Sequence, residues 1–196
     1  MDKVIPVVVI DDVKNTENIL GSIRDGGINC AEITFRTPCA AEAIRLGCEL
    51  YPDMNIGAGT VINAAQCRAA LDAGAKFIVA PGFSDEVAAI CRWENATYYP
   101  GCVTPTEIMH AIDEGFEVVK FFPAGIYGGL EAIKALSAPF PQLKFIPTGG
   151  VSFSNLSDFL SCDSVLAVGG SFMMKGDITA NCKEIVKICE SLRSEK

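Results

Sequence analysis

The chain has 196 residues, which is enough for one domain with a large apolar core. Hydrophobic residues make up 49% and charged residues 20%, a composition that excludes intrinsic disorder. The 24 acidic and 16 basic residues give a net charge of −8, and the basic residues are scattered along the chain. The sequence therefore predicts neither nucleic-acid binding nor binding to an anionic membrane.

The cysteines and the N-terminal residues indicate the cellular compartment. The nine cysteines are an odd number, no pair has CxxC spacing, and most lie within apolar runs. This pattern is typical of free thiols in a reducing compartment and not of a disulfide scaffold. The first residues lack the layout of a signal peptide, and no apolar run is long enough to span a bilayer. We therefore expect a soluble cytoplasmic protein.

Short apolar, β-branched segments alternate with amphipathic stretches, which is the pattern of a parallel α/β fold. The predicted strands are residues 4–10, 31–36, 55–61, 76–81, 97–103, 118–123, 144–148 and 164–169. The predicted helices are residues 16–24, 40–50, 64–73, 84–93, 106–114, 129–137, 154–160 and 180–192. Glycines follow the first, third and fifth of these helices, where glycine commonly ends a helix.

Eight βα units of about 25 residues each have the size of a minimal (β/α)8 barrel. No linker interrupts the alternation, so the sequence predicts one compact α/β domain, a TIM barrel, over residues 1–196. A doubly wound open sheet is the alternative, although such a sheet usually needs only five or six strands. A barrel places its functional residues at the carboxyl ends of its strands and in the loops that follow.

Lys120 lies in the sixth predicted strand, within Val118-Val119-Lys120-Phe121-Phe122. Because strand side chains alternate between two faces, Lys120 and Phe122 share the face that points into a barrel. An amine buried in an apolar interior favours its neutral, nucleophilic form unless a carboxylate pairs with it. The position alone therefore leaves two interpretations open, a nucleophile or a structural ion pair.

The second predicted strand places Glu32, Thr34 and Arg36 on one face, which the same alternation directs into the barrel. These residues could form an internal Glu–Arg ion pair that only satisfies itself. They could equally provide a general acid/base beside a guanidinium that binds an anion. The presence of Lys120 in the same interior favours the second interpretation.

Glycine pairs end the seventh and eighth predicted strands, as Gly149-Gly150 and Gly169-Gly170. The loops after these strands commonly bind phosphate in barrels, through backbone N–H groups and a hydroxyl. Ordinary turns would use the same glycines. We favour binding of a phosphate or a similar anion, because the two pairs occur at the two positions where barrels hold one.

His110 is the only histidine, and it falls in the fifth predicted helix, where we expect it at the surface. A metal-dependent barrel enzyme draws several ligands from His, Asp and Glu. We therefore expect no metal and no cofactor, which leaves Lys120 as the group that would activate a carbonyl substrate.

These motifs together resemble the class I 2-keto-3-deoxy-6-phosphogluconate (KDPG) and 4-hydroxy-2-oxoglutarate (KHG) aldolase family. They occur in the family's order and extend over nearly the whole chain. The matching segments are Glu32-Ile33-Thr34-Phe35-Arg36-Thr37, Gly57-Ala58-Gly59-Thr60-Val61, Pro81-Gly82, Lys120-Phe121-Phe122-Pro123-Ala124, Pro147-Thr148-Gly149-Gly150-Val151 and Gly169-Gly170-Ser171.

The resemblance implies that Lys120 forms a Schiff base with the C2 carbonyl of the substrate and that Glu32 shuttles protons. It also implies a homotrimer and a small-molecule substrate, a phosphorylated 2-keto-3-deoxy sugar acid that yields pyruvate. The remaining implied roles are the pyruvyl carboxylate for Arg36 and Thr60, the pyruvyl pocket for Phe122 and Pro81, the C4 hydroxyl for Thr148, and the distal phosphate for Gly149, Gly150, Gly170 and Ser171.

The predicted reaction is cleavage of KDPG to pyruvate and glyceraldehyde 3-phosphate. One alternative is cleavage of KHG to pyruvate and glyoxylate, or of a related 2-keto-3-deoxy sugar acid. Others are a non-catalytic barrel that binds a phosphate ligand, and a different phosphate barrel such as an isomerase or a thiamin-phosphate-type synthase. The first strand ends Val9-Ile10-Asp11-Asp12, without the arginine of galactonate-type relatives, and the loop at residues 125–129 differs from that of gluconate-type enzymes. The sequence therefore leaves the exact substrate open.

Overall fold

Strands and helices alternate through residues 3–194, the part of the chain that the computed structural model describes. The strands in this part are β1 Val4–Val8, β2 Cys30–Thr34, β3 Asn55–Gly59, β4 Phe77–Val79, β5 Thr97–Tyr99, β6 Val118–Phe121, β7 Lys144–Pro147 and β8 Val168–Gly170. The α-helices are α1 Thr16–Asp25, α2 Ala40–Leu50, α3 Ala64–Asp72, α4 Asp85–Trp93, α5 Pro105–Asp113, α6 Gly129–Ser137, α7 Leu156–Leu160 and α8 Ile178–Ser194. Short 3-10 helices occur at η1 Val13–Asn15 and η2 Phe172–Met174.

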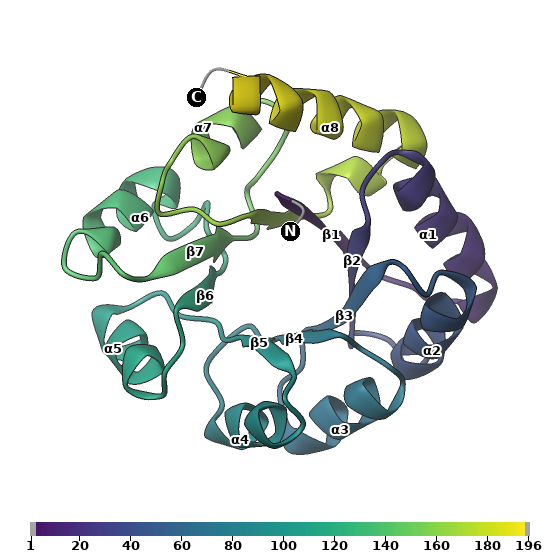
Figure 1. The fold of residues 1–196 in the computed structure, drawn as a ribbon, viewed down its shortest axis with the longest axis horizontal. Helices are drawn as coiled ribbons and strands as arrows, with labels where there is room; N and C mark the ends of the chain where they lie inside the picture. The colour runs from purple at the N-terminus through teal and green to yellow at the C-terminus, as the bar shows by residue number, and fades with distance from the viewer. Residues whose placement is uncertain (1–2, 195–196) are drawn as a thin grey trace.

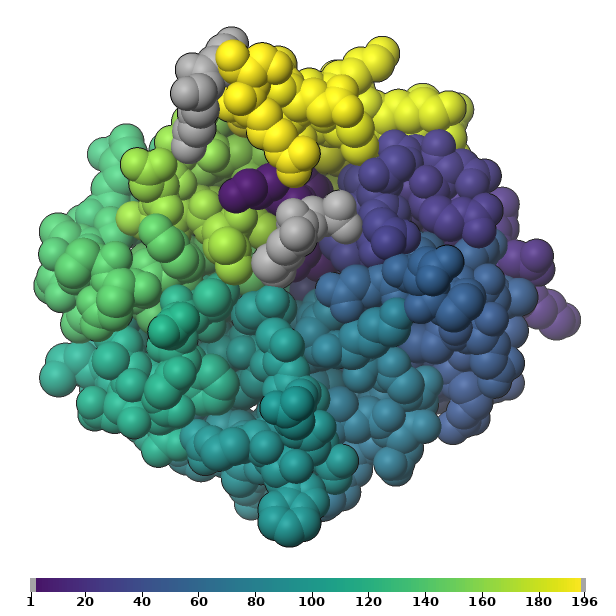
Figure 2. All heavy atoms as spheres, in the orientation of Figure 1, coloured from purple at the N-terminus to yellow at the C-terminus, as the bar shows by residue number. Residues whose placement is uncertain are grey.

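The strands pair in parallel and curl around a central axis, with the helices outside them (Figure 1). One sheet has the order β5-β4-β3-β2-β1-β8, and β6 and β7 form a second sheet. Isolated bridges connect the two sheets, Gly101 to Lys120 on one side and Thr148 to Gly169 on the other. In the space-filling view the elements follow one another around the circumference in chain order (Figure 2). The predicted α/β alternation is confirmed, while the structure has a six-stranded and a two-stranded sheet instead of one ladder of eight.

The register of the strands places alternate side chains in an outer apolar layer and on an inner face of the curled sheet. Ile33 of β2 pairs with Ala58 of β3, which pairs with Ile78 of β4, and all three are fully buried in the hydrophobic core. Glu32 is one residue before Ile33 and pairs with Val7 of β1 and with a glycine of β3. Since successive side chains alternate between faces, Glu32 points away from the layer that Ile33 occupies. This parity directs a carboxylate into the interior of the curled sheet.

Side-chain caps mark the starts of α3, α4 and α5. The side chains of Asn63, Ser84 and Thr104 accept hydrogen bonds from backbone N–H groups in the first turns of α3, α4 and α5. Such caps satisfy N–H groups that have no partner within the helix. At α5 the cap is reciprocal, because Glu107 also accepts the backbone N–H of Thr104. These three helices start within one residue of their predicted first residues, 64, 84 and 106.

The predicted strand bounds were wrong, since all eight strands that the structure describes are shorter than predicted. The fifth predicted strand extends to residue 103, whereas β5 ends at Tyr99. Pro100 follows and has no N–H to donate, so the pairing continues only as a bridge at Gly101. The third predicted strand extends to residue 61, but Thr60 adopts a left-handed conformation with φ of 56° that ends the ladder. The helix predicted at residues 154–160 is observed only from Leu156 to Leu160. The Asn155 side chain instead bonds to the preceding loop, accepting the Ser152 N–H and donating to the Gly150 carbonyl oxygen.

All nine cysteines are free thiols, as the sequence predicted, and five of them are buried. Among residues 3–194 no helix combines the length and the apolar character needed to cross a bilayer.

Candidate active site

A buried ion pair joins two strands that are 88 residues apart in the sequence. The Lys120 Nζ lies 3.3 Å from the Glu32 Oε1, and the two residues are 5% and 2% exposed. Glu32 is the one acidic residue among the buried residues that the structure describes. Removing a single partner of such a pair leaves an uncompensated charge in the interior. The two residues that the sequence singled out for chemistry therefore lie in direct contact.

Gly59 makes room for the Glu32 carboxylate. It lies two residues beyond Gly57, which pairs with Glu32 across the β2–β3 ladder. A Cβ at Gly59 would lie 2.5 Å from both Cγ and Cδ of Glu32 and still closer to its Oε1. Real Cβ atoms essentially never approach other atoms so closely. The side chain of Glu32 thus extends over the backbone of Gly59, and only a residue without a Cβ permits that position.

Arg36 and Thr60 meet just beyond the carboxyl ends of β2 and β3. The Arg36 Nε donates a hydrogen bond to the Thr60 hydroxyl, with 3.3 Å between the atoms. Thr60 is β-branched, so its left-handed conformation is strained. Strain of this kind persists where the surrounding structure over-determines a residue, and it is concentrated at functional sites. The structure thus brings into contact the two residues to which the family resemblance assigns the pyruvyl carboxylate.

A cavity of about 390 Å³ opens at the carboxyl ends of β1, β2, β6, β7 and β8. Seven of the predicted site residues line it: Arg36, Phe122, Thr148, Gly149, Gly150, Gly170 and Ser171. Gly149 and Gly150 adopt φ values of 81° and 88°, a backbone conformation that other residues rarely take. Thr148 is buried at the cavity wall and donates its hydroxyl to the Ile146 carbonyl oxygen at 3.4 Å. The two glycine-rich loops therefore face one shared space.

Phe122 connects this cavity to the buried ion pair. Its ring lines the cavity, and the Lys120 Nζ lies 5.3 Å from the ring centroid. Lys120, Glu32 and Thr60 do not line the cavity themselves. Pro81, also predicted, does not line it either, and it is exposed after β4. Its carbonyl group lies so close to Gly101 that a Cβ there would clash, and Gly101 forms the bridge to Lys120.

Sequence reasoning missed five residues of the cavity wall: Val7, Val9, Val151, Phe172 and Lys175. Val7 lies on the inward-facing side of β1, and Val9, two residues later, continues the same alternation. This alternation is visible in the sequence and could have predicted both residues. Val151 follows Gly150 directly and could have been read from the motif. Phe172 and Lys175 belong to the loop after β8, whose path no periodicity predicts. Lys175 is exposed and lies four residues after Ser171.

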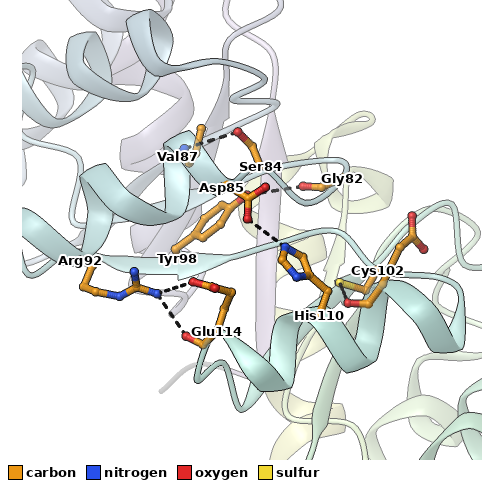
Figure 3. A network of polar contacts seen from close by, with 10 residues as sticks. Gly82, Ser84, Asp85, Val87, Arg92, Tyr98, Cys102, His110 and Glu114 are labelled. Atoms are coloured by element: carbon orange, nitrogen blue, oxygen red, sulfur yellow. Dashed lines mark hydrogen bonds and ion pairs between the residues drawn. The ribbon is translucent and has the colours of Figure 1, made fainter.

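The single histidine takes part in a polar network that links α4 and α5 at the surface. His110 of α5 is hydrogen-bonded to Asp85 of α4, and Arg92 is paired with Glu114 (Figure 3). Both contacts have a length of 2.9 Å. The ring of His110 also packs edge-on against Phe83, with 4.4 Å between the centroids. The predicted place of His110 on a helix surface is confirmed. Among residues 3–194 no group of three or more His, Cys, Asp or Glu side chains is arranged to hold a metal ion.

Comparison with known proteins shows relatives along nearly the whole chain. The family model "KDPG and KHG aldolase" matches residues 1–188. The chain is 42% identical over 172 residues to the 2-dehydro-3-deoxy-phosphogluconate aldolase of Treponema pallidum, covering 88% of this chain and 82% of the relative. It is 37% identical over 174 residues to the KHG/KDPG aldolase of Escherichia coli, covering 89% and 82%.

Solved structures show the same relationship. The KDPG aldolase of Zymomonas mobilis superposes with a TM-score of 0.89 at 38% identity, covering 93% of this chain and 91% of that one. The KDPG aldolase of Legionella pneumophila, with pyruvate captured as a covalent carbinolamine intermediate, superposes with a TM-score of 0.88 at 35% identity and covers 97% and 93%. By sequence and by structure, the chain belongs to the KDPG and KHG aldolase family.

Proposed function

We propose that this chain is a Schiff-base-forming class I aldolase that cleaves KDPG to pyruvate and glyceraldehyde 3-phosphate. The observation that carries the proposal is the buried Lys120–Glu32 pair, beside a cavity whose wall includes Phe122 and Arg36. The Legionella pneumophila relative, with its covalent pyruvate carbinolamine, supports the same chemistry. The reaction class is that of an aldehyde-lyase.

Lys120 provides the nucleophile in this proposal. Its amine attacks the C2 carbonyl carbon of the substrate, and the resulting carbinolamine loses water to form a protonated imine. The amine must give up a proton before it attacks, and Glu32 lies close enough to accept it. The positive charge on the imine then attracts the electron pair that is released at C3 when the C3–C4 bond breaks.

Glu32 transfers the protons that the cleavage requires. It takes the proton of the C4 hydroxyl as the C3–C4 bond breaks, so the aldehyde leaves and the pyruvyl part remains as an enamine on Lys120. A proton returned to C3 converts the enamine into the pyruvate imine. Addition of water at C2 then releases pyruvate and regenerates the amine. Each proton taken from the substrate is returned, so the reaction needs no cofactor.

The cavity residues orient the substrate around this pair. Arg36 and Thr60 bind the C1 carboxylate, since a guanidinium matches a carboxylate with two parallel hydrogen bonds. Phe122 and Pro81 line the pyruvyl pocket, and Thr148 lies at the C4 hydroxyl. Backbone N–H groups of the loops with Gly149, Gly150, Gly170 and Ser171 bind the distal phosphate. The shared cavity wall of seven of these residues supports this arrangement.

The fold and the assembly belong to the same proposal. We infer that residues 1–196 form one closed (β/α)8 domain, which the bridges between the two sheets support. We further propose a homotrimer, because Trp93, Ile126 and Ile62 are 87%, 84% and 59% exposed and a subunit interface would cover such apolar side chains. We propose a cytoplasmic location as well, which the nine free cysteines support. Sedimentation equilibrium of the purified chain tests the trimer, and a monomer at micromolar concentration would contradict it.

Borohydride trapping tests the proposed chemistry. Reduction in the presence of pyruvate should leave a stable pyruvyl adduct, and mass spectrometry should place it on the peptide that contains Lys120. Lys120→Met removes the amine and should abolish both the adduct and pyruvate release from KDPG. Folded wild-type protein that forms no adduct would refute the Schiff-base mechanism. A Lys120→Met variant with full activity would favour the alternative in which Lys120 is only an ion-pair partner.

KHG cleavage is the second candidate function, because the Escherichia coli relative is named for both substrates. The two activities share the imine chemistry and differ in the aldehyde product. Comparing kcat/KM for KDPG and KHG on the same preparation separates them. A value for KHG above that for KDPG would replace the first proposal with the second.

A further inference from the structure

The charged residues of the cavity are unusual for this chain. The chain has more acidic than basic residues, 24 against 16, yet the charged residues of the cavity wall are two cations, Arg36 and Lys175, with no acidic residue among them. A wall of this kind raises the local concentration of anions and offers no competing internal carboxylate. Two separate cations suit a ligand that carries two anionic groups.

The two cations lie on opposite sides of β1. Arg36 follows β2, and its guanidinium Nε donates a hydrogen bond to Thr60, the residue directly after the next strand, β3. Lys175 follows β8, which pairs with the other edge of β1 through Pro6 and Gly170. Val7 and Val9 of the first strand and its extension line the cavity between them. The cavity therefore extends across β1, with one cation toward each end.

Hydrogen bonds hold the backbone around Lys175, whereas its ammonium group has no polar partner among the described residues. The Asn181 Nδ2 of α8 donates hydrogen bonds to the backbone carbonyl oxygens of Met173 and Lys175, at 3.0 and 2.8 Å. The Met174 N–H also bonds back to the Ser171 carbonyl oxygen. Within residues 3–194, the ammonium group of Lys175 makes no hydrogen bond or ion pair. The loop thus holds a cation at the cavity wall without neutralising it.

We propose that Lys175 is a specificity-determining residue that binds the distal phosphate of the substrate, at the end of the cavity opposite Arg36. This inference rests on the proposed function and extends it, because it assigns the distal group a side-chain cation besides the backbone N–H groups of the glycine loops. A phosphate binds an ammonium group more strongly than it binds a neutral donor. Lys175 therefore favours substrates with an anionic distal group over uncharged sugar acids of the same length.

Steady-state kinetics with two substrates test the assignment. KDPG is compared with 2-keto-3-deoxygluconate, which lacks the phosphate, for the wild type and for Lys175→Met, Lys175→Arg and Lys183→Met. Lys183 is an exposed lysine of α8 outside the cavity wall. Lys183→Met therefore removes the same charge as Lys175→Met without changing the cavity. Because the phosphate does not react, Lys175→Met should raise KM for KDPG about ten-fold or more while kcat stays within about two-fold.

The unphosphorylated substrate and the two other variants complete the kinetic test. KM for 2-keto-3-deoxygluconate should not change in Lys175→Met, Lys175→Arg should retain most of the affinity for KDPG, and Lys183→Met should behave as the wild type. The inference would be overturned if Lys175→Met raised KM equally for both substrates. It would also be overturned if KM of Lys175→Met for KDPG equalled that of Lys183→Met.

Equilibrium binding separates this inference from the proposed function. 6-Phosphogluconate has the same terminal carboxylate and phosphate but no C2 ketone, so it binds without forming an imine. Calorimetry should show that Lys175→Met weakens its binding about ten-fold or more and that Lys183→Met does not. Binding that depends on Lys175 in a protein that cleaves no KDPG would refute the aldolase and keep the anion site. Absence of wild-type binding, or equal binding by both variants, would overturn the anion site.

Discussion

Substituting alanine for Gly59 tests whether the exact position of the Glu32 carboxylate matters. The added Cβ would lie 2.5 Å from both Cγ and Cδ of Glu32, whereas ordinary van der Waals contact begins at 3.4 Å. The side chain of Glu32 must therefore move by roughly 1 Å, and a misplacement of this size can cost about 100-fold in rate. Gly59 is not among the residues with positive φ, so alanine adds no backbone strain there. The effect comes from steric displacement alone.

The assay is pyruvate release from KDPG, coupled to lactate dehydrogenase, together with urea unfolding of the same preparations. We expect kcat of Gly59→Ala to fall about 100-fold. The overpacked interior should lose about 1–3 kcal/mol of unfolding free energy, which leaves the protein folded. Gly82→Ala is the matched control, because a Cβ at Gly82 meets nothing within 4 Å. A folded Gly59→Ala variant with wild-type kcat would refute the reasoning that Glu32 must occupy this position to transfer protons.

Three further predictions concern strain, acid stability and thiol reactivity. Thr60→Gly should relieve the strained φ and raise the unfolding free energy by about 1 kcal/mol, while KM for pyruvyl substrates rises because Arg36 loses its hydroxyl partner; a less stable variant would contradict this. Burial opposes ionisation of Glu107, but hydrogen bonds from Val103 and Thr104 hold the pKa of this carboxyl below its usual value. Its stabilising contribution is therefore present above the unfolded-state pKa of about 4.3 and is lost as pH falls through the folded-state pKa, so Glu107→Gln should be less stable than the wild type near neutral pH, with the gap closing on acidification in urea titrations. Burial raises the pKa of the Cys102 thiol to about 12 and that of Cys182 to about 11, so iodoacetamide at about pH 8 should modify them only after unfolding, while the partly exposed Cys162 reacts first; rapid modification of Cys102 in the native protein would show that it is accessible.

Local periodicity determined much of this protein. Alternation of side chains along strands was sufficient to direct Glu32 and Lys120 to the interior, because the side chain of a strand residue points to one of only two faces. Capping side chains at Asn63 and Thr104 set helix starts through contacts within a few residues. The glycine pairs at Gly149 and Gly170 marked the loops after β7 and β8. Each of these signals depends on near neighbours in the chain, and the sequence contains it directly.

The tertiary structure decided what depends on distant parts of the chain. The contact of Glu32 with Lys120 joins residues 88 apart, and it needs Gly59 of a third strand to leave space for the carboxylate. Beyond Pro100 the chain remains attached to β6 through hydrogen bonds from Lys120 N–H to the Pro100 carbonyl oxygen and from Cys102 N–H to the Lys120 carbonyl oxygen, contacts between elements that strand propensity does not describe. Lys175 reaches the cavity because Asn181 of α8 fixes the loop that bears it. Such positions result from packing and hydrogen bonds between elements, so periodicity along the sequence could not predict them.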